Sequence, residues 1–217
     1  MKHTIEEVPF DEDMRKFVSD IYNKRQKLFE EYLSQLLWWN KRMNLMSRGV
    51  SRETVRDHIK HSLLITALKE FQQNEIIIDT GTGGGLPGIP LSISCPEKEV
   101  MLNDVVSKKI VAVKQMAHKL KLKKVSFSPK SIEKVKVSEG ALIVTKHAFK
   151  VNGLLNMIGA EPWKSIVMLK GYQKVKEELS GVDTALSIGV YHLDKVYKTD
   201  FYSGKGLIVI KKKAEIE

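Results

Sequence analysis

The hydrophobic positions in the N-terminal third of the chain recur at helical spacing. From Asp11 to about Met46, side chains three and four residues apart form one mainly apolar stripe, which comprises Phe29, Tyr32, Leu33, Leu36, Leu37, Asn40 and Met43. A second helix is expected from Ser51, whose hydroxyl can cap the first turn, to about Phe71. Residues 1–74 are therefore predicted to form an N-terminal helical subdomain.

The pattern changes at about residue 75, where short apolar runs replace the amphipathic stripes. The first run, Ile76 to Ile78, is fully apolar and ends at Asp79, as expected of a central parallel strand. Strands are predicted at residues 76–78, 99–102, 125–127, 141–145, 165–169, 191–197 and 206–210, and helices at 89–94 and 107–120. This alternation predicts a doubly wound, Rossmann-like α/β domain over residues 75–217.

A glycine-rich turn follows the first predicted strand. After Asp79, glycines stand at alternate positions, namely Gly81, Gly83 and Gly85. Glycine allows a positive φ and lets a ligand approach the backbone closely. Open α/β sheets bind ligands at this edge. A dinucleotide-binding turn would place its third glycine at position 86, which is Leu86. The spacing instead resembles the first motif of class I S-adenosylmethionine-dependent methyltransferases.

An acidic residue, Asp104, ends the second predicted strand. A carboxylate at that place can accept hydrogen bonds from both ribose hydroxyls of a nucleoside. Asp79, the alternate glycines and Asp104 are therefore predicted to bind S-adenosylmethionine.

The groups that the sequence lacks narrow the reaction. There is no Asn-Pro-Pro-Tyr run, and Cys95 is expected to be a half-buried small hydrophobe rather than a nucleophile. His58 and His61 have no third ligand that could complete a zinc site, so no metal is predicted. An acceptor with a free lone pair, such as N7 of guanine, needs only alignment and charge stabilisation.

Positive charge is concentrated in one stretch. The chain carries a net charge of +10, and between Lys98 and Lys136 eleven lysines stand against three acidic residues. We expect this basic stretch (Lys98 to Lys136) to contact RNA, although a solvated helix face gives the same pattern. Trp38 and Trp39 flank the N-terminal stripe, and we expect them to pack in the core rather than to stack on bases.

The composition predicts a protein of the cytoplasm. No apolar run approaches the roughly 20 residues of a membrane span, the N-terminus is polar and acidic, and Cys95 has no cysteine partner. No membrane or DNA partner is expected.

Several motifs together resemble one family. They are Trp-Asn-Lys-Arg-Met-Asn-Leu at 39–45, His-Ile-Lys-His-Ser-Leu at 58–63, the glycine turn with its Leu-Pro-Gly-Ile-Pro tail at 79–90, Asp-Val-Val-Ser-Lys-Lys at 104–109, Met-Leu-Lys-Gly at 168–171 and Leu-Ile-Val-Ile-Lys at 207–211. On these residues the chain is similar to the glucose-inhibited-division protein B family, the 16S ribosomal RNA guanine-N7 methyltransferases.

The resemblance implies a function and further site residues. It implies methyl transfer from S-adenosylmethionine to N7 of a guanine, with 16S ribosomal RNA or the small ribosomal subunit as partner. It places the cofactor at Gly81 and Leu86, with adenine near Ile132 and Glu133. His147, where the family usually has arginine, would contact the cofactor, and His147 and Lys170 would position the guanine or its phosphate without acid–base chemistry.

Two other functions fit the same sequence. A methyltransferase-fold RNA-binding or ribosome-assembly protein with weak or lost activity is suggested by Ser131, Leu142 and His147, which depart from the family's usual residues. A small-molecule methyltransferase would turn over independently of salt, whereas RNA recognition weakens steeply as salt rises.

Overall fold

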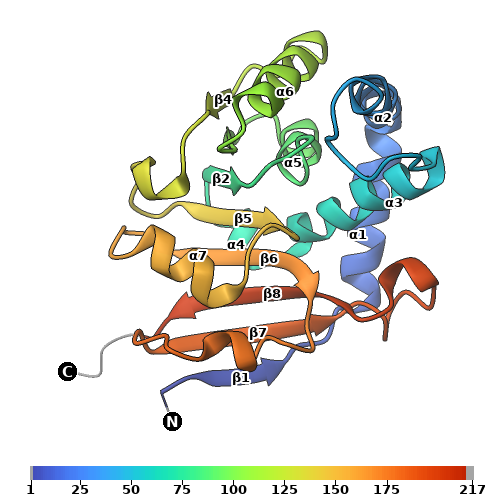
Figure 1. The fold of residues 1–217 in the computed structure, drawn as a ribbon. Helices are drawn as coiled ribbons and strands as arrows, with labels where there is room; N and C mark the ends of the chain where they lie inside the picture. The colour runs from blue at the N-terminus through green and yellow to red at the C-terminus, as the bar shows by residue number, and fades with distance from the viewer. Residues whose placement is uncertain (1, 214–217) are drawn as a thin grey trace.

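The architecture is a single mixed sheet with helices on both of its faces (Figure 1). A computed structural model describes residues 2–213, and within them eight strands follow the order β1-β7-β8-β6-β5-β2-β3-β4. The strands are β1 (Thr4–Glu7), β2 (Ile76–Thr80), β3 (Glu99–Asn103), β4 (Val125–Ser128), β5 (Leu142–Lys146), β6 (Ser165–Gly171), β7 (Leu186–His192) and β8 (Lys205–Lys212). Strands β2 to β6 are parallel to one another, and β8 runs antiparallel between β6 and β7. The predicted doubly wound α/β fold is confirmed.

The helices follow the chain between these strands. They are α1 (Glu12–Lys24), α2 (Gln26–Asn40), α3 (Arg52–Leu63), α4 (Lys69–Gln72), α5 (Gly88–Ser94), α6 (Ser107–Lys119) and α7 (Val151–Ile158). Four 3₁₀ turns are also described, namely η1 (Leu64–Ala67), η2 (Ile132–Lys134), η3 (Glu177–Leu179) and η4 (Asp200–Tyr202).

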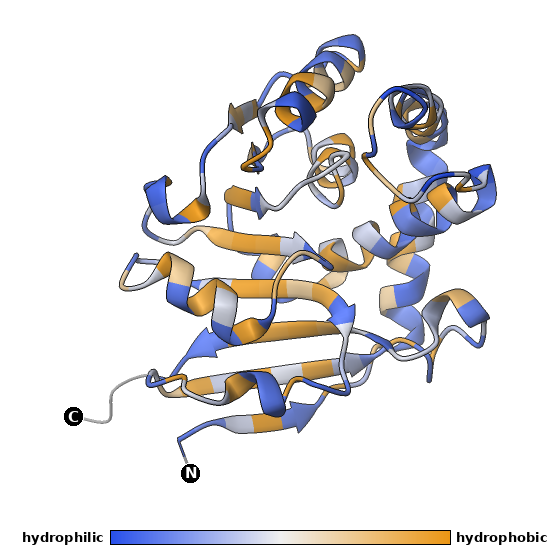
Figure 2. Ribbon diagram, in the orientation of Figure 1, coloured by the Kyte–Doolittle hydropathy of each residue, from blue (hydrophilic) through white to orange (hydrophobic). Residues whose placement is uncertain are grey.

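Side chains of the central strands alternate between two hydrophobic cores. In β5, Leu142 and Val144 face the core that contains α1, α2, α3, α5 and α6, whereas Ile143 faces the core that contains α7. Because both faces of the strand are buried, its sequence is a continuous apolar run without polar alternation. Figure 2 shows the resulting orange strands in the middle of the molecule, with blue surfaces on the outer helices.

The helical predictions for the N-terminal segment were too long. The helix predicted from Asp11 to Met46 is broken at Arg25, which leaves the helical backbone region at φ −115°. The helix predicted from Ser51 to Phe71 is divided into α3, η1 and α4, because Leu68 adopts an extended conformation. Ser51 does cap α3, since its hydroxyl accepts from the Thr54 amide at 3.1 Å.

In the outer part of the sheet, one strand was missed and one predicted strand was shifted. Strand β1 was not predicted, because this edge strand is mostly exposed and shows no apolar alternation. It pairs in parallel with β7. The strand predicted at 191–197 is shifted, because β7 ends at His192 and the Val196 and Tyr197 amides turn back to the Leu193 carbonyl.

The residues on either side of the predicted subdomain boundary share one core. Phe29 and Leu36 of α2 lie in the same hydrophobic cluster as Ile77 of β2. The division into 1–74 and 75–217 stays a prediction, and its outermost residues, Met1 and 214–217, lie outside the described range.

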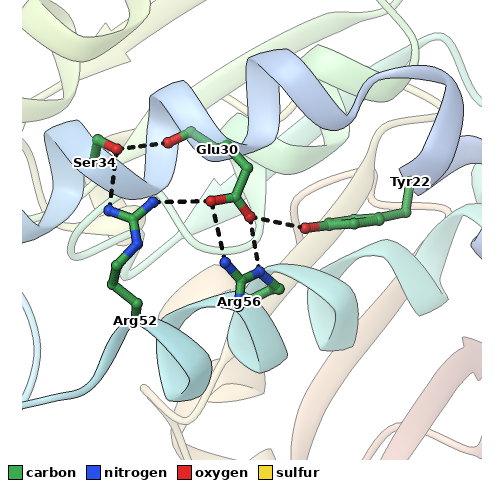
Figure 3. Close-up of polar contacts among 5 residues, drawn as sticks. All are labelled: Tyr22, Glu30, Ser34, Arg52 and Arg56. Atoms are coloured by element: carbon green, nitrogen blue, oxygen red, sulfur yellow. Dashed lines mark hydrogen bonds and ion pairs between the residues drawn. The ribbon is translucent and has the colours of Figure 1, made fainter.

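One carboxylate joins the first three helices (Figure 3). Glu30 of α2 accepts from both Arg56 nitrogens of α3, Nε at 2.7 Å and Nη2 at 3.2 Å, and from Arg52 Nη2 at 2.9 Å. The hydroxyl of Tyr22, on α1, donates to the same carboxylate at 3.2 Å. The hydrogen bond with Arg56 lowers the pKa of Glu30 to about 2. The network fixes the orientation of α2, the helix that covers the glycine turn.

Candidate cofactor and substrate site

The glycine turn (residues 81–85) leaves β2 at the carboxyl edge of the sheet. Gly81, Gly83 and Gly85 have φ values of +70°, +56° and +96°, which other residues rarely adopt. A Cβ at Gly81 would lie 2.5 Å from the Ala148 Cβ, whereas at Gly83 nothing would be closer than 3.8 Å. The turn therefore packs tightly at Gly81, whereas a Cβ at Gly83 would make only ordinary van der Waals contacts.

Asp79 supports the turn from inside. Its fully buried carboxylate accepts from the Thr82 hydroxyl at 2.6 Å and from the Gly88 amide at 2.8 Å, both through Oδ2. The other oxygen, Oδ1, has no hydrogen-bond partner among the described residues. Burial raises the pKa of Asp79 to about 7. Its predicted contact with the cofactor stays a prediction, since the contacts described here shape the turn.

Asp104 lies against the turn, at the tip of β3. Its Oδ2 accepts from the Gly83 amide at 3.0 Å, and its Oδ1 accepts from the Val106 amide at 2.9 Å. Each carboxylate oxygen has a second lone pair that can accept from a sugar hydroxyl. The structure thus brings together the two parts of the predicted cofactor site that lie 25 residues apart in sequence.

The loop and helix before the sheet cover this turn from the other side. The Tyr32 hydroxyl donates to the Gly84 carbonyl at 2.8 Å, and a Cβ at Gly84 would lie 2.6 Å from the Leu36 Cδ1. Asn40 Oδ1 accepts from the Leu45 amide at 3.0 Å and so folds the following loop over Gly83 and Gly84. No site role was predicted for Tyr32 or Asn40, although the polar Asn40 within an apolar stripe was a usable signal.

The predicted adenine contacts have different surroundings. Ile132 is buried in the core that contains α7, whereas Glu133 is exposed on η2. Leu86 is buried, and its amide donates to the Thr82 carbonyl at 3.0 Å. Contacts of these three residues with a nucleoside stay predictions.

His147 and Lys170 line one cavity at the ends of β5 and β6. The cavity has a volume of about 630 Å³ and is lined by His147, Ala148, Phe149, Lys150, Lys170, Gly171, Gln173, Lys174 and Glu178. His147 is exposed and has a φ of +55°. The ammonium of Lys170 forms a buried ion pair with Glu178, and the Glu178 carboxylate also accepts from the Val151 amide at 2.8 Å. Lys170 is thus held by an acid, and its predicted role toward guanine stays a prediction.

A cluster of basic side chains, which the sequence analysis did not assemble, lies beside His147. Lys146, at the end of β5, makes a 2.6 Å hydrogen bond with Nδ1 of His58 on α3. His61, one helical turn after His58, is fully buried, and its ring centroid lies 6.0 Å from that of His147. Lys205, at the start of β8, places its ammonium 3.6 Å from the Phe201 ring centroid. We call His58, His61, Lys146, His147 and Lys205 the basic cluster.

Burial and mutual repulsion depress the pKa values of this cluster. Desolvation lowers the pKa of Lys146 to about 7, of His58 to about 3 and, although His147 as a whole is exposed, of its ring to about 4. Burial also lowers the pKa of His61 well below its usual range and that of Lys205 by less. The positive charge of neighbouring lysines also lowers the pKa values of the three histidines.

Most of the basic stretch lies on the surface, as predicted, but Lys98 does not. Lys98 is buried, and its ammonium donates to the Asn74 carbonyl at 2.7 Å and pairs with Glu75 at 3.1 Å. Lys109 is half-buried with its ammonium 3.7 Å from Asp104, and the remaining lysines of the stretch are exposed on α6, on η2 and in the loops on either side of β4. Lys98 is therefore removed from the predicted RNA contacts.

The two tryptophans differ in burial. Trp39 packs partly against the core, but the expectation of core packing was wrong for Trp38, which is 50% exposed. Arg42 covers the Trp38 ring, with its guanidinium carbon 3.3 Å from the ring centroid. The exposure follows from the helical period, which places Trp38 on the outer side of α2.

Three other features bear on the predicted chemistry. Cys95 is half-buried, and burial raises the pKa of its thiol to about 11. Over residues 2–213, no three histidine, cysteine or acidic side chains are grouped as a metal would require. None of the helices described is both long enough and apolar enough to cross a membrane.

A family comparison now identifies the chain. The family model described as rRNA small subunit methyltransferase G matches residues 25–199, which include the glycine turn, Asp104, His147 and Lys170. The chain belongs to this family. The resemblance drawn from the sequence motifs is thereby confirmed.

Individual relatives of the rRNA small subunit methyltransferase G family carry the name ribosomal RNA small subunit methyltransferase G. The protein of Flavobacterium psychrophilum is 28% identical over 94% of this chain and 100% of its own length. That of Flavobacterium johnsoniae is 32% identical over 78% of this chain and 83% of its own length. That of Chlorobium chlorochromatii is 40% identical, but over 57% of this chain and 53% of its own length.

Solved structures share the fold at low identity. An O-methyltransferase from Bacillus cereus, in complex with SAH, aligns with a TM-score of 0.58 and 16% identity over 84% of this chain and 90% of that one. Magnesium protoporphyrin IX methyltransferase from Synechocystis, with bound SAM, aligns with a TM-score of 0.57 and 12% identity over 94% of this chain and 99% of that one. These likenesses support the Rossmann-like methyltransferase fold.

Proposed function

We propose that this protein transfers a methyl group from S-adenosylmethionine to N7 of a guanine in the ribosomal RNA of the small subunit. The observation that carries the proposal is the position of the glycine turn. The turn lies between Asp104, which accepts from the Gly83 amide at 3.0 Å, and the loop of Ala148 and Phe149 after β5. A donor site and an acceptor site therefore adjoin at one edge of the sheet.

The residues present fit the cofactor. Gly83 is not tightly packed, Asp104 has free lone pairs, and the buried Oδ1 of Asp79 lacks a partner among the described residues. S-adenosylmethionine supplies a methyl group activated by its sulfonium charge. Asp104 would hold the ribose hydroxyls, the glycine turn would hold the amino acid part, and Ile132 and Glu133 would lie beside the adenine.

The acceptor side needs alignment rather than proton transfer. Guanine N7 has a free lone pair and no proton to remove, so its placement in line with the methyl group decides the rate. His147 is exposed at this edge, and its low pKa of about 4 leaves its ring neutral near pH 7. A neutral ring can donate one hydrogen bond to the base and accept another. Lys170, held by Glu178, would define the floor of the cavity.

The two alternative functions, an RNA-binding or assembly protein with weak or lost activity and a small-molecule methyltransferase, have less support than the activity of the family. The family model covers the turn, Asp104 and the loop after β5, and the turn has kept its positive φ values and its supporting hydrogen bonds. A chain that had lost the cofactor would have no need of this geometry. We further place the protein in the cytoplasm, with 16S ribosomal RNA or the small ribosomal subunit as its partner.

Substitution of Gly83 by valine tests the proposal. Wild-type protein should bind S-adenosylmethionine in calorimetry and transfer labelled methyl to small-subunit rRNA, with the label recovered as 7-methylguanine. Gly83→Val should abolish both, because a branched side chain is strained at φ +56° and fills the space beside Gly83. Gly181→Val is the control, since its φ of +76° is similar and its surroundings are open. Methyl transfer by Gly83→Val at the wild-type rate would exclude the proposed pocket.

A further inference from the structure

The basic cluster gathers five positively ionisable groups from three separate parts of the chain. His58 and His61 come from α3, Lys146 and His147 from the end of β5, and Lys205 from the start of β8. These elements meet on the side of the molecule to which β5 points in Figure 1. The cluster lies next to the glycine turn, because Ala148, which follows His147, is the residue that a Cβ at Gly81 would strike.

Few acids oppose this charge. The two carboxylates that act on the cluster's lysines are Asp79, which raises the pKa of Lys146, and Asp57, which raises that of Lys205. Asp79 is itself engaged by Thr82 and Gly88. Over residues 2–213, neither Lys146 nor Lys205 has an ion pair with an acid, in contrast to Lys170, which is paired with Glu178. Near pH 7 the histidines are neutral, so the unpaired positive charge of the cluster lies on Lys205 and on the protonated fraction of Lys146.

The cluster also leaves hydrogen-bonding capacity unused. The ammonium of Lys146 is bonded to His58, and that of Lys205 to the Phe201 carbonyl, so each retains further N–H donors. Both ring nitrogens of the fully buried His61 lack a partner within the described chain. Unpaired buried polar groups are costly, so native structures usually provide a partner for them. His147 and the partly buried Lys146, His58 and Lys205 leave the cluster open to solvent on one side.

We propose that the basic cluster binds a phosphate group of the RNA backbone next to the methylated nucleotide. A phosphate offers several strong acceptor oxygens and at least one negative charge, which match several unsatisfied N–H donors and an unbalanced positive charge. The cluster lies beside the glycine turn, so the backbone of a nucleotide held there for methylation would come within its reach. The inference rests on the proposed function for the identity of the RNA, but the phosphate chemistry rests on the cluster alone.

Proton uptake follows from this arrangement. A bound phosphate stabilises the protonated form of each cluster residue, so binding near pH 7 should draw a proton onto Lys146, whose pKa of about 7 leaves it partly neutral. The charged or titratable groups that contact Lys146 or act on its charge are His58, His61, His147, Lys205 and Asp79. The histidines also gain protons if the phosphate raises their pKa values far enough. RNA binding should therefore strengthen as pH falls from 8 to 6.

The test is calorimetry of the protein, without methyl donor, with a short guanine-containing single-stranded RNA. Titrations at pH 7 in two buffers of different ionisation enthalpy give the number of protons taken up, and a salt series gives the slope of log affinity against log salt. Lys146→Gln should lower the affinity for RNA several-fold and reduce proton uptake. It should also reduce the salt slope by about one, the amount expected for the loss of one phosphate contact. Lys146→Arg should keep the affinity but lose that uptake, because arginine stays charged.

Lys69→Gln is the matched control. Lys69 is exposed on α4, which leads into the amino end of β2, so this variant removes one charge at the opposite edge of the sheet. It should behave as wild type. Thermal unfolding of each variant verifies that the fold is retained. If Lys146→Gln and Lys205→Gln both bind RNA with wild-type affinity, salt slope and proton uptake, the inference is overturned.

Inorganic phosphate distinguishes the source of the anion. In ring NMR spectra, a shift of the His58 signals with RNA but not with equimolar phosphate assigns the site to the backbone. Equal shifts with both support a phosphate site that needs no RNA, and shifts with neither overturn the proposal. Failure of the proposed function would appear separately, as absent methyl-donor heat or absent methyl transfer while this RNA binding persists.

Discussion

The carboxyl edge of the sheet has two halves that satisfy their polar groups in different ways. Around β2 and β3, the carboxylates of Asp79 and Asp104 accept hydrogen bonds from a hydroxyl and from amides of nearby residues. Around β5 and β8, Lys146 and Lys205 have no acid as a partner among residues 2–213. Glycine and backbone amides can build the first half, but the second half depends on side chains brought from distant parts of the chain.

The difference indicates which half has charge that only a bound ligand could neutralise. In the half around Asp104, amides and a hydroxyl of the chain already hold both carboxylates, although Oδ1 of Asp79 lacks a partner among the described residues, so a cofactor there would add contacts to an existing frame. The half around Lys146 has excess charge, so its ligand would also relieve repulsion.

The largest expected effect is at the buried ion pair that borders the second half. Glu178→Ala should lower the free energy of unfolding by about 3 kcal/mol, because it leaves the Lys170 ammonium buried without an acid. It also removes the acceptor of the Val151 amide. Urea unfolding measures the effect, and Glu177→Ala, at an exposed neighbour, should change little. A double substitution Lys170→Met with Glu178→Leu should recover much of the loss, and an undiminished loss would contradict the charge explanation.

A smaller effect is expected within the first half. Gly88→Ala should destabilise by about 2 kcal/mol, because its Cβ would lie 2.2 Å from the Leu102 Cδ2 and 2.7 Å from the Asp79 Oδ2. The displaced carboxylate should also weaken binding of S-adenosylmethionine, which calorimetry measures. Gly153→Ala on α7 has nothing within 4 Å and should be neutral or slightly stabilising. Equal stability of the two variants would show that the frame of this half is not rigid.

A third effect, which depends on pH, concerns the stability of the second half. Burial lowers the pKa of Lys146 from 10.5 to about 7, so between these values the unfolded chain binds a proton that the folded chain does not. Lys146 therefore destabilises the folded state most at pH 7 and below, and its penalty declines as pH rises toward 10.5. Lys146→Gln should be more stable than wild type at pH 7, by a margin that shrinks by pH 10.

Urea unfolding of both proteins in dilute buffer without phosphate gives this margin at each pH. Lys69→Gln should show no comparable margin at pH 7, because its side chain is exposed at the opposite edge. A Lys146→Gln variant that is less stable than wild type at pH 7 would mean that Lys146 stabilises the fold, and the contrast between the halves would then fail.

The sequence predicted the central sheet well, for a physical reason. Strands buried on both faces, such as β2 and β5, consist of apolar runs that no helix period explains. The outer strands were harder to predict. Strand β1 is exposed along most of its length, and β7 contains Gly189, which weakens the strand signal at its centre.

The site was predictable to the extent that it is local in sequence. The glycine turn and Asp104 belong to one βαβ unit, and their spacing alone predicted that they lie together, as Asp104 and Gly83 do. The basic cluster combines residues 58, 146 and 205, whose proximity depends on tertiary packing and has no sequence period. Lys98 illustrates the opposite error, because charge counting cannot recognise a lysine that is buried against carbonyl groups.

The contact between α2 and the glycine turn limits how this protein can be altered. The Tyr32 hydroxyl holds the Gly84 carbonyl, and Leu36 fills the space that a side chain at Gly84 would need. If the N-terminal helices were exchanged with those of a relative in order to redirect the enzyme to another RNA, the contacts of the glycine turn would change as well. The exchange would therefore also change how the protein binds the methyl donor. Substitutions in α2 and in the turn should therefore be coupled, and a redesign of either has to keep Tyr32 and Leu36 together with the turn.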